Sequence, residues 1–352
     1  MKLISYKAKC GDAFHIQYVG ESGRRRNIFL DMGYSKTYTG VLKNVISSMV
    51  GTSDIIDVLF LSHIHDDHIG GATKLINDIE SGEGLEDVVG RWIYNVPRKY
   101  DVIQTHEKKE GVLCGIVSGD IVYEHIFNIC PSDLDDYTEG KSFDVDGMKV
   151  TLLSPDTDKL NQLRLKYAKN RPICKSETDE ASVEAGSVSD DYSTPLTDFN
   201  TDSFQEDTSI ENASSIAATF EFGDKRILWL ADSVPSVVIC SLSKMGFSNK
   251  NRVHCDAVLL SHHGSAANNS LDLFRMISAD RYVISADGIN RYCLPNKQTV
   301  ARIVSASSTF PVNLYLNYND GRLKRMFDVD VVYGLKSMID VIFLGDMEAI
   351  EI

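Results

Sequence analysis

The chain has 352 residues, of which 43% are hydrophobic, so it is long enough to bury a large core. No apolar run approaches the roughly 18 to 20 residues that span a bilayer, and the first residues lack a signal-peptide pattern, which together predict a soluble cytoplasmic protein without membrane contact. The formal charge is −14, but eleven acids lie between Ser176 and Glu211 without any Lys or Arg. Taking those eleven from −14 leaves −3, so charge neither excludes nor favours nucleic acid.

Short strands are predicted over 2–7, 13–19 and 27–31, followed by a helix over 41–49. The strand over 27–31 is apolar and ends in Asp31, which a methionine and a glycine follow. Seven scattered cysteines without a Cys-x-x-Cys pair predict reduced thiols rather than a disulfide framework.

The segment 57–71 joins a predicted buried strand over 58–61 to a cluster of metal-binding residue types. This cluster comprises His63, His65, Asp67 and His68. Imidazoles and carboxylates are ligands of zinc, and also of manganese or iron. The chain has only nine histidines, so three within six positions favour a metal site over a chance surface loop. The glycine pair at 70–71 predicts a tight turn into a helix over 72–79.

A composition change interrupts the middle of the chain. Strands are predicted over 91–96 and 149–154, and then Ser, Thr, Asp and Glu predominate from 157 to 211. Such a segment buries too little apolar surface to offset the entropy of ordering, so we expect an inserted loop, largely mobile over 175–209. A plain solvated insertion and a tether for a protein partner are the two interpretations of it.

Ordered elements are predicted again from residue 213. A hairpin over 215–231 ends in Asp232, and a strand over 256–261 ends in His262 and His263. Helices over 235–245, 270–278 and 296–305 alternate with a strand over 281–286, and strands over 312–317 and 341–344 follow. This alternation predicts a layered α/β protein with a first half (1–156), the insertion (157–211), a second half (212–305) and a strand-rich C-terminal extension (306–352).

Three predicted strands therefore end in metal-binding groups: the cluster over 63–68, Asp232, and the pair His262 and His263. Strand ends on one edge of a sheet converge in space. A carboxylate such as that of Asp232 can bridge two cations about 3.5 to 4 Å apart, and such cations lower the pKa of a bound water towards about 7.

The His-x-His-x-Asp-His pattern over 63–68, with a strand before it and Gly-Gly after it, resembles the signature of the metallo-β-lactamase superfamily. The resemblance implies an αββα sandwich, a single domain with the insertion, and two divalent ions, with Zn²⁺ first and Mn²⁺ as the alternative. It implies that His63 and His65 hold one ion, that Asp67 and His68 hold the other, and that Asp232 bridges. His263 is preferred to His262 as the last ligand, because it precedes a glycine, and His262 would then donate a proton to the leaving group. The implied catalytic set is Asp67, His262 and His263.

Further segments resemble the metallo-β-lactamase domains of ComEC-type DNA-uptake proteins. The most diagnostic is His-His-Gly-Ser over 262–265; the others lie at 31–33, 152–155, 212–215, 229–232 and 290–295. This branch implies a nuclease or phosphodiesterase with a nucleic acid or nucleotide substrate. By the same resemblance Asp31 supports a ligand histidine or its loop from behind. Asn212 and Ser215 occupy the place of a third-motif histidine, for which His106 and His125 are alternatives.

Two departures from that branch bear on function. Leu294 stands where a histidine is usual in the segment 290–295, and Ala231 replaces a glycine before Asp232. Asn290, Arg291 and Tyr292 are the expected substrate-binding residues, and the arginine favours phosphate. Hydrolysis of a carboxylic ester, thioester or lactam by the same centre is the second hypothesis. A metal-stabilised sensor or scaffold with weakened catalysis is the third.

Overall fold

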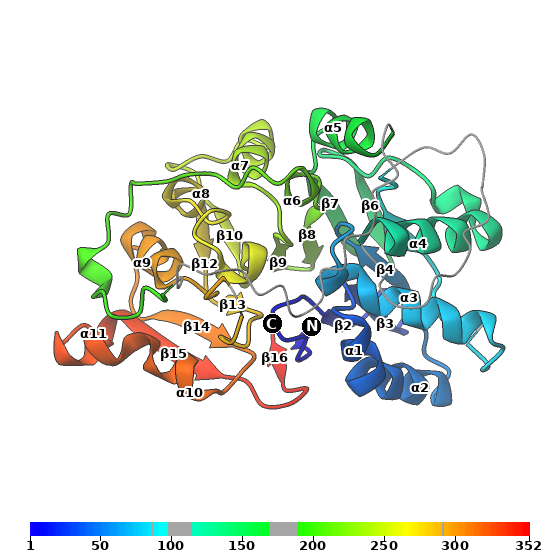
Figure 1. Cartoon of the computed structure of the whole chain (residues 1–352), viewed down its shortest axis with the longest axis horizontal. Helices are drawn as coiled ribbons and strands as arrows, with labels where there is room; N and C mark the ends of the chain where they lie inside the picture. Colours follow the sequence, from blue (N-terminus) through cyan, green and yellow to red (C-terminus); the bar gives the residue numbers. More distant parts are fainter. Residues whose placement is uncertain (86, 98–114, 169–188, 291) are drawn as a thin grey trace.

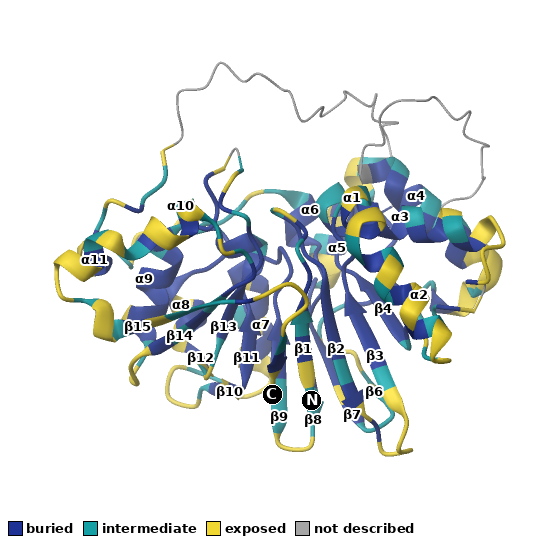
Figure 2. Cartoon of the chain, turned by 90° about the horizontal axis from the view of Figure 1, so that it is seen from below, coloured by how far each residue is buried: buried dark blue, intermediate teal, exposed yellow. Residues whose placement is uncertain are grey.

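Two β-sheets lie face to face, and helices cover the outer face of each (Figures 1 and 2). The computed structural model describes residues 1–85, 87–97, 115–168, 189–290 and 292–352. Helices α2 to α4 lie on one side of the sheet pair and α9 to α11 on the other. The αββα sandwich expected from the sequence is thus present.

The first sheet has the strand order β16-β1-β2-β3-β4-β5. Its strands are β1 (Lys2–Ser5), β2 (Phe14–Val19), β3 (Arg25–Leu30), β4 (Val58–Leu61), β5 (Trp92–Tyr94) and β16 (Ala349–Glu351). The second sheet has the order β15-β14-β13-β11-β9-β8-β7-β6. Its strands are β6 (Ser142–Val145), β7 (Met148–Ser154), β8 (Ala217–Phe222), β9 (Lys225–Trp229), β11 (Ala257–Leu259), β13 (Tyr282–Ile284), β14 (Val312–Leu316) and β15 (Ile339–Phe343). A separate parallel pair consists of β10 (Val253–Cys255) and β12 (Ile277–Ala279).

The helices are α1 (Ser35–Thr37), α2 (Lys43–Gly51), α3 (Asp66–Glu80), α4 (Gly115–Ile129), α5 (Thr157–Ala168), α6 (Ile210–Ala213), α7 (Pro235–Lys244), α8 (Leu271–Arg275), α9 (Lys297–Ala306), α10 (Gly321–Lys324) and α11 (Asp328–Val332). Short 3-10 or π turns are η1 (Tyr38–Leu42), η2 (Pro131–Asp133), η3 (Leu196–Asp198), η4 (Ser261–Gly264), η5 (Arg325–Phe327) and η6 (Lys336–Met338). Within the described ranges, none of the helices combines the length and apolar character that crossing a bilayer requires.

The central strands are apolar along their whole length because both of their faces are buried. In β4, Val58 and Phe60 pack between the two sheets, whereas Leu59 and Leu61 pack against the helices. The same alternation holds in β9, where Trp229 faces the other sheet and Leu228 faces the helices. Three apolar layers result, and they hold the strand ends in fixed positions.

The two ends of the chain lie side by side, because β16 pairs with β1 in antiparallel register (Figure 1). Strands β14 and β15 extend the second sheet in parallel from β13. The stretch 306–352, predicted as an extension, therefore contributes strands to both sheets.

The expectation of a mobile loop over 175–209 is wrong for residues 189–209, which pack against the second half of the fold; residues 169–188 lie outside the described part. The two carboxylate oxygens of Asp191 accept the backbone N–H groups of Lys297 and Gln298, each at 2.8 Å, at the start of α9. Tyr192 and Leu196 are buried. Further upstream, residues 157–168 form helix α5. One acid of this stretch, Asp191, thus satisfies two N–H groups at the start of α9, and the buried Tyr192 and Leu196 anchor the segment.

His15 on β2 is a buried imidazole outside the candidate site. Its ring stacks on Phe29 at 4.4 Å, and its Nε2 lies 3.0 Å from the Asn27 side-chain oxygen. Burial lowers the pKa of His15 to about 4, from an ordinary value of 6.5, although the bond to Asn27 acts in the opposite direction. Between these values only the unfolded chain takes up the proton. The stability of the fold with a neutral, buried His15 is therefore fully present above pH 6.5 and decreases as the pH falls towards 4.

We expect this one group to remove about 3 kcal/mol of unfolding free energy across that range, at about 1.4 kcal/mol per pKa unit. His15→Gln, which does not titrate, should lose correspondingly less stability between pH 7 and pH 4.5. Urea unfolding of both proteins at the two pH values measures the difference. Equal losses in the two proteins would contradict a neutral buried His15.

Candidate metal centre

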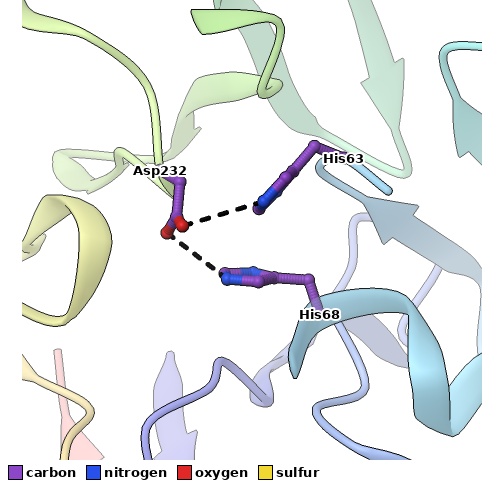
Figure 3. Close-up of side chains that lie close together, drawn as sticks. All are labelled: His63, His68 and Asp232. Carbon is purple, nitrogen blue, oxygen red and sulfur yellow. Dashed lines mark ion pairs between the residues drawn. The ribbon is translucent and has the colours of Figure 1, made fainter. Parts of the chain in front are cut away.

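The three predicted strand ends meet at one edge of the sheet pair. The segment after β4 supplies His63 and His68, the segment after β9 supplies Asp232, and η4, after β11, supplies His262 and His263. Figure 3 shows His63 and His68 pointing toward the Asp232 carboxylate from separate elements. These residues all follow the carboxyl ends of strands. Because β3 runs parallel to β4, and β9 runs parallel to β11, the carboxyl ends within each pair lie at the same edge of their sheet.

Helix α3 begins at Asp66, inside the ligand cluster, and not after the glycines at 70–71. The predicted turn is therefore wrong. A side chain at Gly71 would place its Cβ 2.2 Å from the backbone oxygen of Met32, so the glycine permits close helix-to-loop packing rather than a turn. This packing places Asp67 and His68 in the first turn of the helix, facing the sheet edge.

Asp232 presents one carboxylate oxygen to each of two groups of imidazoles. Its Oδ1 lies 3.3 Å from His68 Nε2 and 4.0 Å from His263 Nε2. Its Oδ2 lies 3.7 Å from His63 Nε2 and 3.7 Å from His262 Nε2. This is the arrangement expected of a carboxylate that bridges two cations.

Asp67 completes the group on the Oδ1 side. Its Oδ2 lies 3.4 Å from His263 Nε2 and 3.8 Å from His68 Nε2. Asp67, His68 and His263 thus offer ligand atoms that all lie within 4.8 Å of one another, as do His63, His68 and Asp232.

The Nδ1 atom of each buried imidazole is held from behind. His68 Nδ1 lies 2.7 Å from Asp31 Oδ2, His63 Nδ1 lies 3.0 Å from Ser62 Oγ, and His263 Nδ1 lies 3.1 Å from the Ser285 carbonyl oxygen. Such contacts fix the ring orientation and leave Nε2 as the ring atom that can bind a metal ion. Asp31, for which the resemblance implies a supporting role, thus lies against the Nδ1 atom of His68.

The residues present fit a cation. Among the described residues, the Nε2 atoms of His63, His68 and His263 and the Oδ1 of Asp232 are fully buried and have no hydrogen-bond partner. Each buried polar atom without a partner is destabilising by about 1 to 3 kcal/mol. Four such atoms directed at one place form a donor set that a cation bound between them would satisfy.

Charges within this cluster are strongly coupled. Burial lowers the pKa of His68, but the carboxylates of Asp232 and Asp67 outweigh burial and hold it well above its ordinary range. Burial raises the pKa of Asp232, but the imidazoles of His68 and His262 hold it well below its ordinary range. Burial, together with neighbouring imidazoles, holds the pKa of His63 well below 6.5. A bound cation would take the place of the imidazole protons in this network.

The backbone at the site is strained. Ala231 (φ 45°), His262 (φ 46°) and His263 (φ 54°) have left-handed conformations, as does Asp31 (φ 57°). A non-glycine residue in this region is destabilised by about 1 to 2 kcal/mol, so the surrounding contacts must hold it there. The two left-handed residues in succession direct the neighbouring histidines to different oxygens of Asp232.

Other predicted site residues are placed differently. His65 is half-buried with its ring 4.6 Å from that of His63, and it joins none of the three-ligand groups formed by the described residues. Asn212 lies beside His262, its Nδ2 3.4 Å from the ring Nδ1, whereas Ser215 is buried without a hydrogen bond from its hydroxyl. His125 packs against Trp92, away from the centre.

The loop expected to bind substrate has its own internal structure. The Asn290 side chain donates to the Leu294 carbonyl at 2.7 Å and accepts the Leu294 N–H at 3.0 Å, so it closes the loop on itself. Leu294 is buried, and the Tyr292 side chain is exposed. Arg291 and His106 lie outside the described residues. The substrate-binding role of this loop stays a prediction.

Sequence reasoning missed four residues that support the centre: Asp12, Asp207, Asn268 and Ser285. Asp12 Oδ1 lies 3.2 Å from His263 Nδ1, and Asn268 Oδ1 lies 2.9 Å from His262 Nδ1. Asp207 had been counted with the acidic insertion. Asp12, Asp207 and Ser285 are separated in sequence from the metal-binding motifs, whereas the Asn-Asn pair at 268–269, shortly after the histidines, was a usable signal.

No family model and no curated protein matches this chain. Among solved structures, it is similar to the metallo-β-lactamase fold protein YhfI from Bacillus subtilis, with 10% identity, a TM-score of 0.43, and coverage of 99% of this chain and 98% of that one. Zn²⁺-bound PqqB from Methylobacterium extorquens gives 11% identity, a TM-score of 0.43 and full coverage of both chains. The diiron β-hydroxylase CmlA from Streptomyces venezuelae gives 12% identity and a TM-score of 0.43, and this chain covers 54% of its length.

These values are too low to transfer an activity. The fold class itself follows from the layers, the strand orders and the position of the His and Asp residues beyond the strand ends. It is an αββα sandwich, the architecture that the sequence resemblance to the metallo-β-lactamase superfamily implies.

Proposed function

We propose that this protein is a metal-dependent hydrolase that cleaves phosphodiester bonds in a nucleic acid or a nucleotide. One observation carries the metal dependence: buried Nε2 atoms of His63, His68 and His263 converge with the carboxylates of Asp67 and Asp232. Two divalent ions fit this donor set, with Zn²⁺ as the first candidate because imidazole suits it, and Mn²⁺ as the second. When bound, such ions supply an activated water and neutralise charge on the group that is attacked.

The choice of a phosphodiester rests on the sequence resemblance to the ComEC-type branch. The protein's own groups would divide the work. Asp67 and Asp232 hold positive charge at the strand ends, and Asp31 keeps the His68 ring oriented through its 2.7 Å contact. His65, half-buried with its ring beside that of His63, is a further ligand candidate by the resemblance alone.

The buried Leu294 favours a second candidate function. An aliphatic side chain can neither bind a metal nor move a proton, so the group usual at this place in the branch is missing. A metal-binding sensor or scaffold with weakened catalysis would tolerate that loss.

Metal analysis and a substrate panel test the proposal. Purified protein should contain or take up close to two equivalents of Zn²⁺ or Mn²⁺ and should hydrolyse bis(p-nitrophenyl)phosphate. It should show little activity on p-nitrophenyl acetate or on a chromogenic lactam. Metal uptake without turnover of any of these, or of single-stranded DNA, RNA and cyclic dinucleotides, would favour the sensor. Preferred turnover of the ester or the lactam would favour the carboxyl-hydrolase alternative.

A further inference from the structure

The two sides of Asp232 differ in how many ligands surround them. On the Oδ1 side lie His68, His263 and Asp67, which is enough protein ligands for a catalytic ion. On the Oδ2 side, at 3.7 Å, lie the Nε2 atoms of His63 and His262. The third-motif histidine that the resemblance leads one to expect has no counterpart on this side among the described residues.

We propose that His262 is the imidazole that completes the metal position on the Oδ2 side of Asp232, and that Asp207 and Asn268 are the residues that position it. This inference rests on the proposed metal-dependent function. It replaces the role of proton donor that the sequence had suggested for His262, and it gives Asp207 a place in the metal centre.

Hydrogen bonds to Asn268 define the His262 tautomer. The Asn268 Nδ2 donates to Asp207 Oδ2 and to the Asp232 backbone carbonyl, both at 3.1 Å. Those two acceptors determine which end of the amide is nitrogen, so its Oδ1 faces His262 Nδ1 at 2.9 Å and accepts from it. A proton on Nδ1 leaves the lone pair of the neutral ring on Nε2, which is the atom directed at Asp232.

Asp207 supports the same ring and is itself held firmly. Its Oδ2 lies 3.6 Å from His262 Nδ1 and accepts from Asn212 Nδ2 at 2.6 Å. Its Oδ1 accepts the Ser209 N–H at 2.8 Å, and its own N–H donates to the Ala267 carbonyl at 3.1 Å. A carboxylate behind a ligand imidazole raises the basicity of the ring and orients it, as Asp31 does for His68.

The backbone conformation of η4 serves this arrangement. His262 N–H donates to the Ala231 carbonyl at 2.8 Å, and Ser265 N–H donates to the His262 carbonyl at 2.9 Å. These bonds hold the left-handed backbone that directs His262 to Oδ2 and His263 to Oδ1. Two adjacent histidines thereby serve the two different positions.

Metal binding by the full-length chain, stripped of metal and then titrated with Co²⁺ or Zn²⁺, tests the inference. The wild-type protein should bind two equivalents. His262→Ala should bind one equivalent and lose part of the visible Co²⁺ absorption. Asp207→Asn, which keeps the side-chain volume, should bind one of the two ions about 10- to 100-fold more weakly.

Glu206→Gln is the matched control, because Glu206 is the neighbouring acid but accepts from Ser236 at 2.8 Å instead. It should bind both ions as the wild type does. If His262→Ala keeps two equivalents at unchanged affinity, or if Asp207→Asn matches the wild type, the inference is wrong whatever the activity. If the wild type binds two ions but cleaves no phosphodiester, the proposed function fails while the ligand assignment stands.

Discussion

Asp67→Asn and Asp232→Asn are each expected to lower kcat/KM for bis(p-nitrophenyl)phosphate by about three orders of magnitude or more. Asp232 contacts imidazoles on both sides of the centre, and Asp67 contacts two of them. A neutral amide of the same size preserves the shape but removes the negative charge that would balance the proposed cations. Such a variant should lose several kcal/mol of electrostatic stabilisation of the transition state. Each 1.4 kcal/mol corresponds to about tenfold in rate.

Asp66→Asn is the control for this pair of variants. Asp66 lies next to Asp67 in the same first turn of α3, but its carboxylate accepts from Ser118 Oγ at 2.8 Å and belongs to none of the ligand groups. Its turnover should stay within about threefold of the wild type, because the amide keeps an oxygen that can accept from Ser118 and no charge is removed from the ligand groups. Equal losses in Asp66→Asn and Asp67→Asn would show that the start of α3, and not ligand charge, accounts for the effect.

Lys297→Met is expected to lower the free energy of unfolding by about 3 to 5 kcal/mol. The Lys297 Nζ lies 2.5 Å from Asp330 Oδ2, and both side chains are buried. Nζ also donates to the Tyr192 carbonyl at 3.3 Å. Asp330 Oδ1 accepts the Leu196 N–H at 2.8 Å, so the variant leaves a buried carboxylate without its cation at a junction of three segments.

Urea unfolding followed by circular dichroism measures this loss. The double variant Lys297→Met/Asp330→Asn removes both charges and keeps an acceptor for the Leu196 N–H, so it should recover more than half of the stability. A single variant within about 1 kcal/mol of the wild type would indicate that water reaches the pair.

Several elements could be predicted because their signal is local. The four apolar residues of β4 lie between the predicted limits 58 and 61, and α7 and α9 begin within a residue of the predicted 235 and 296. Residues of metal-binding type directly after apolar strands predicted that the cluster over 63–68, Asp232 and the pair His262 and His263 would meet at one sheet edge. Periodicity and strand ends depend on neighbours in sequence, so they are visible in the sequence alone.

The predictions that were wrong also share one cause, which is contact with residues distant in the chain. The glycines at 70–71 were interpreted as a turn, whereas they lie within α3, where Gly71 permits the close approach of the Met32 backbone. Asp191 and Asp207 were grouped with a solvated acidic stretch, whereas one caps α9 and the other supports His262. In each instance the partner is far away in the chain, at positions that composition does not reveal.

The sequence by itself determined which residue types stand at the strand ends, and therefore that a cation site and a layered α/β fold were to be expected. Only the tertiary structure decided which acid meets which imidazole, which oxygen of Asp232 each ring faces, and that Asp207 lies beside His262. The physical reason is that strand and helix patterns are set by adjacent residues. Ligand geometry is set by contacts between segments that come together only when both sheets pack.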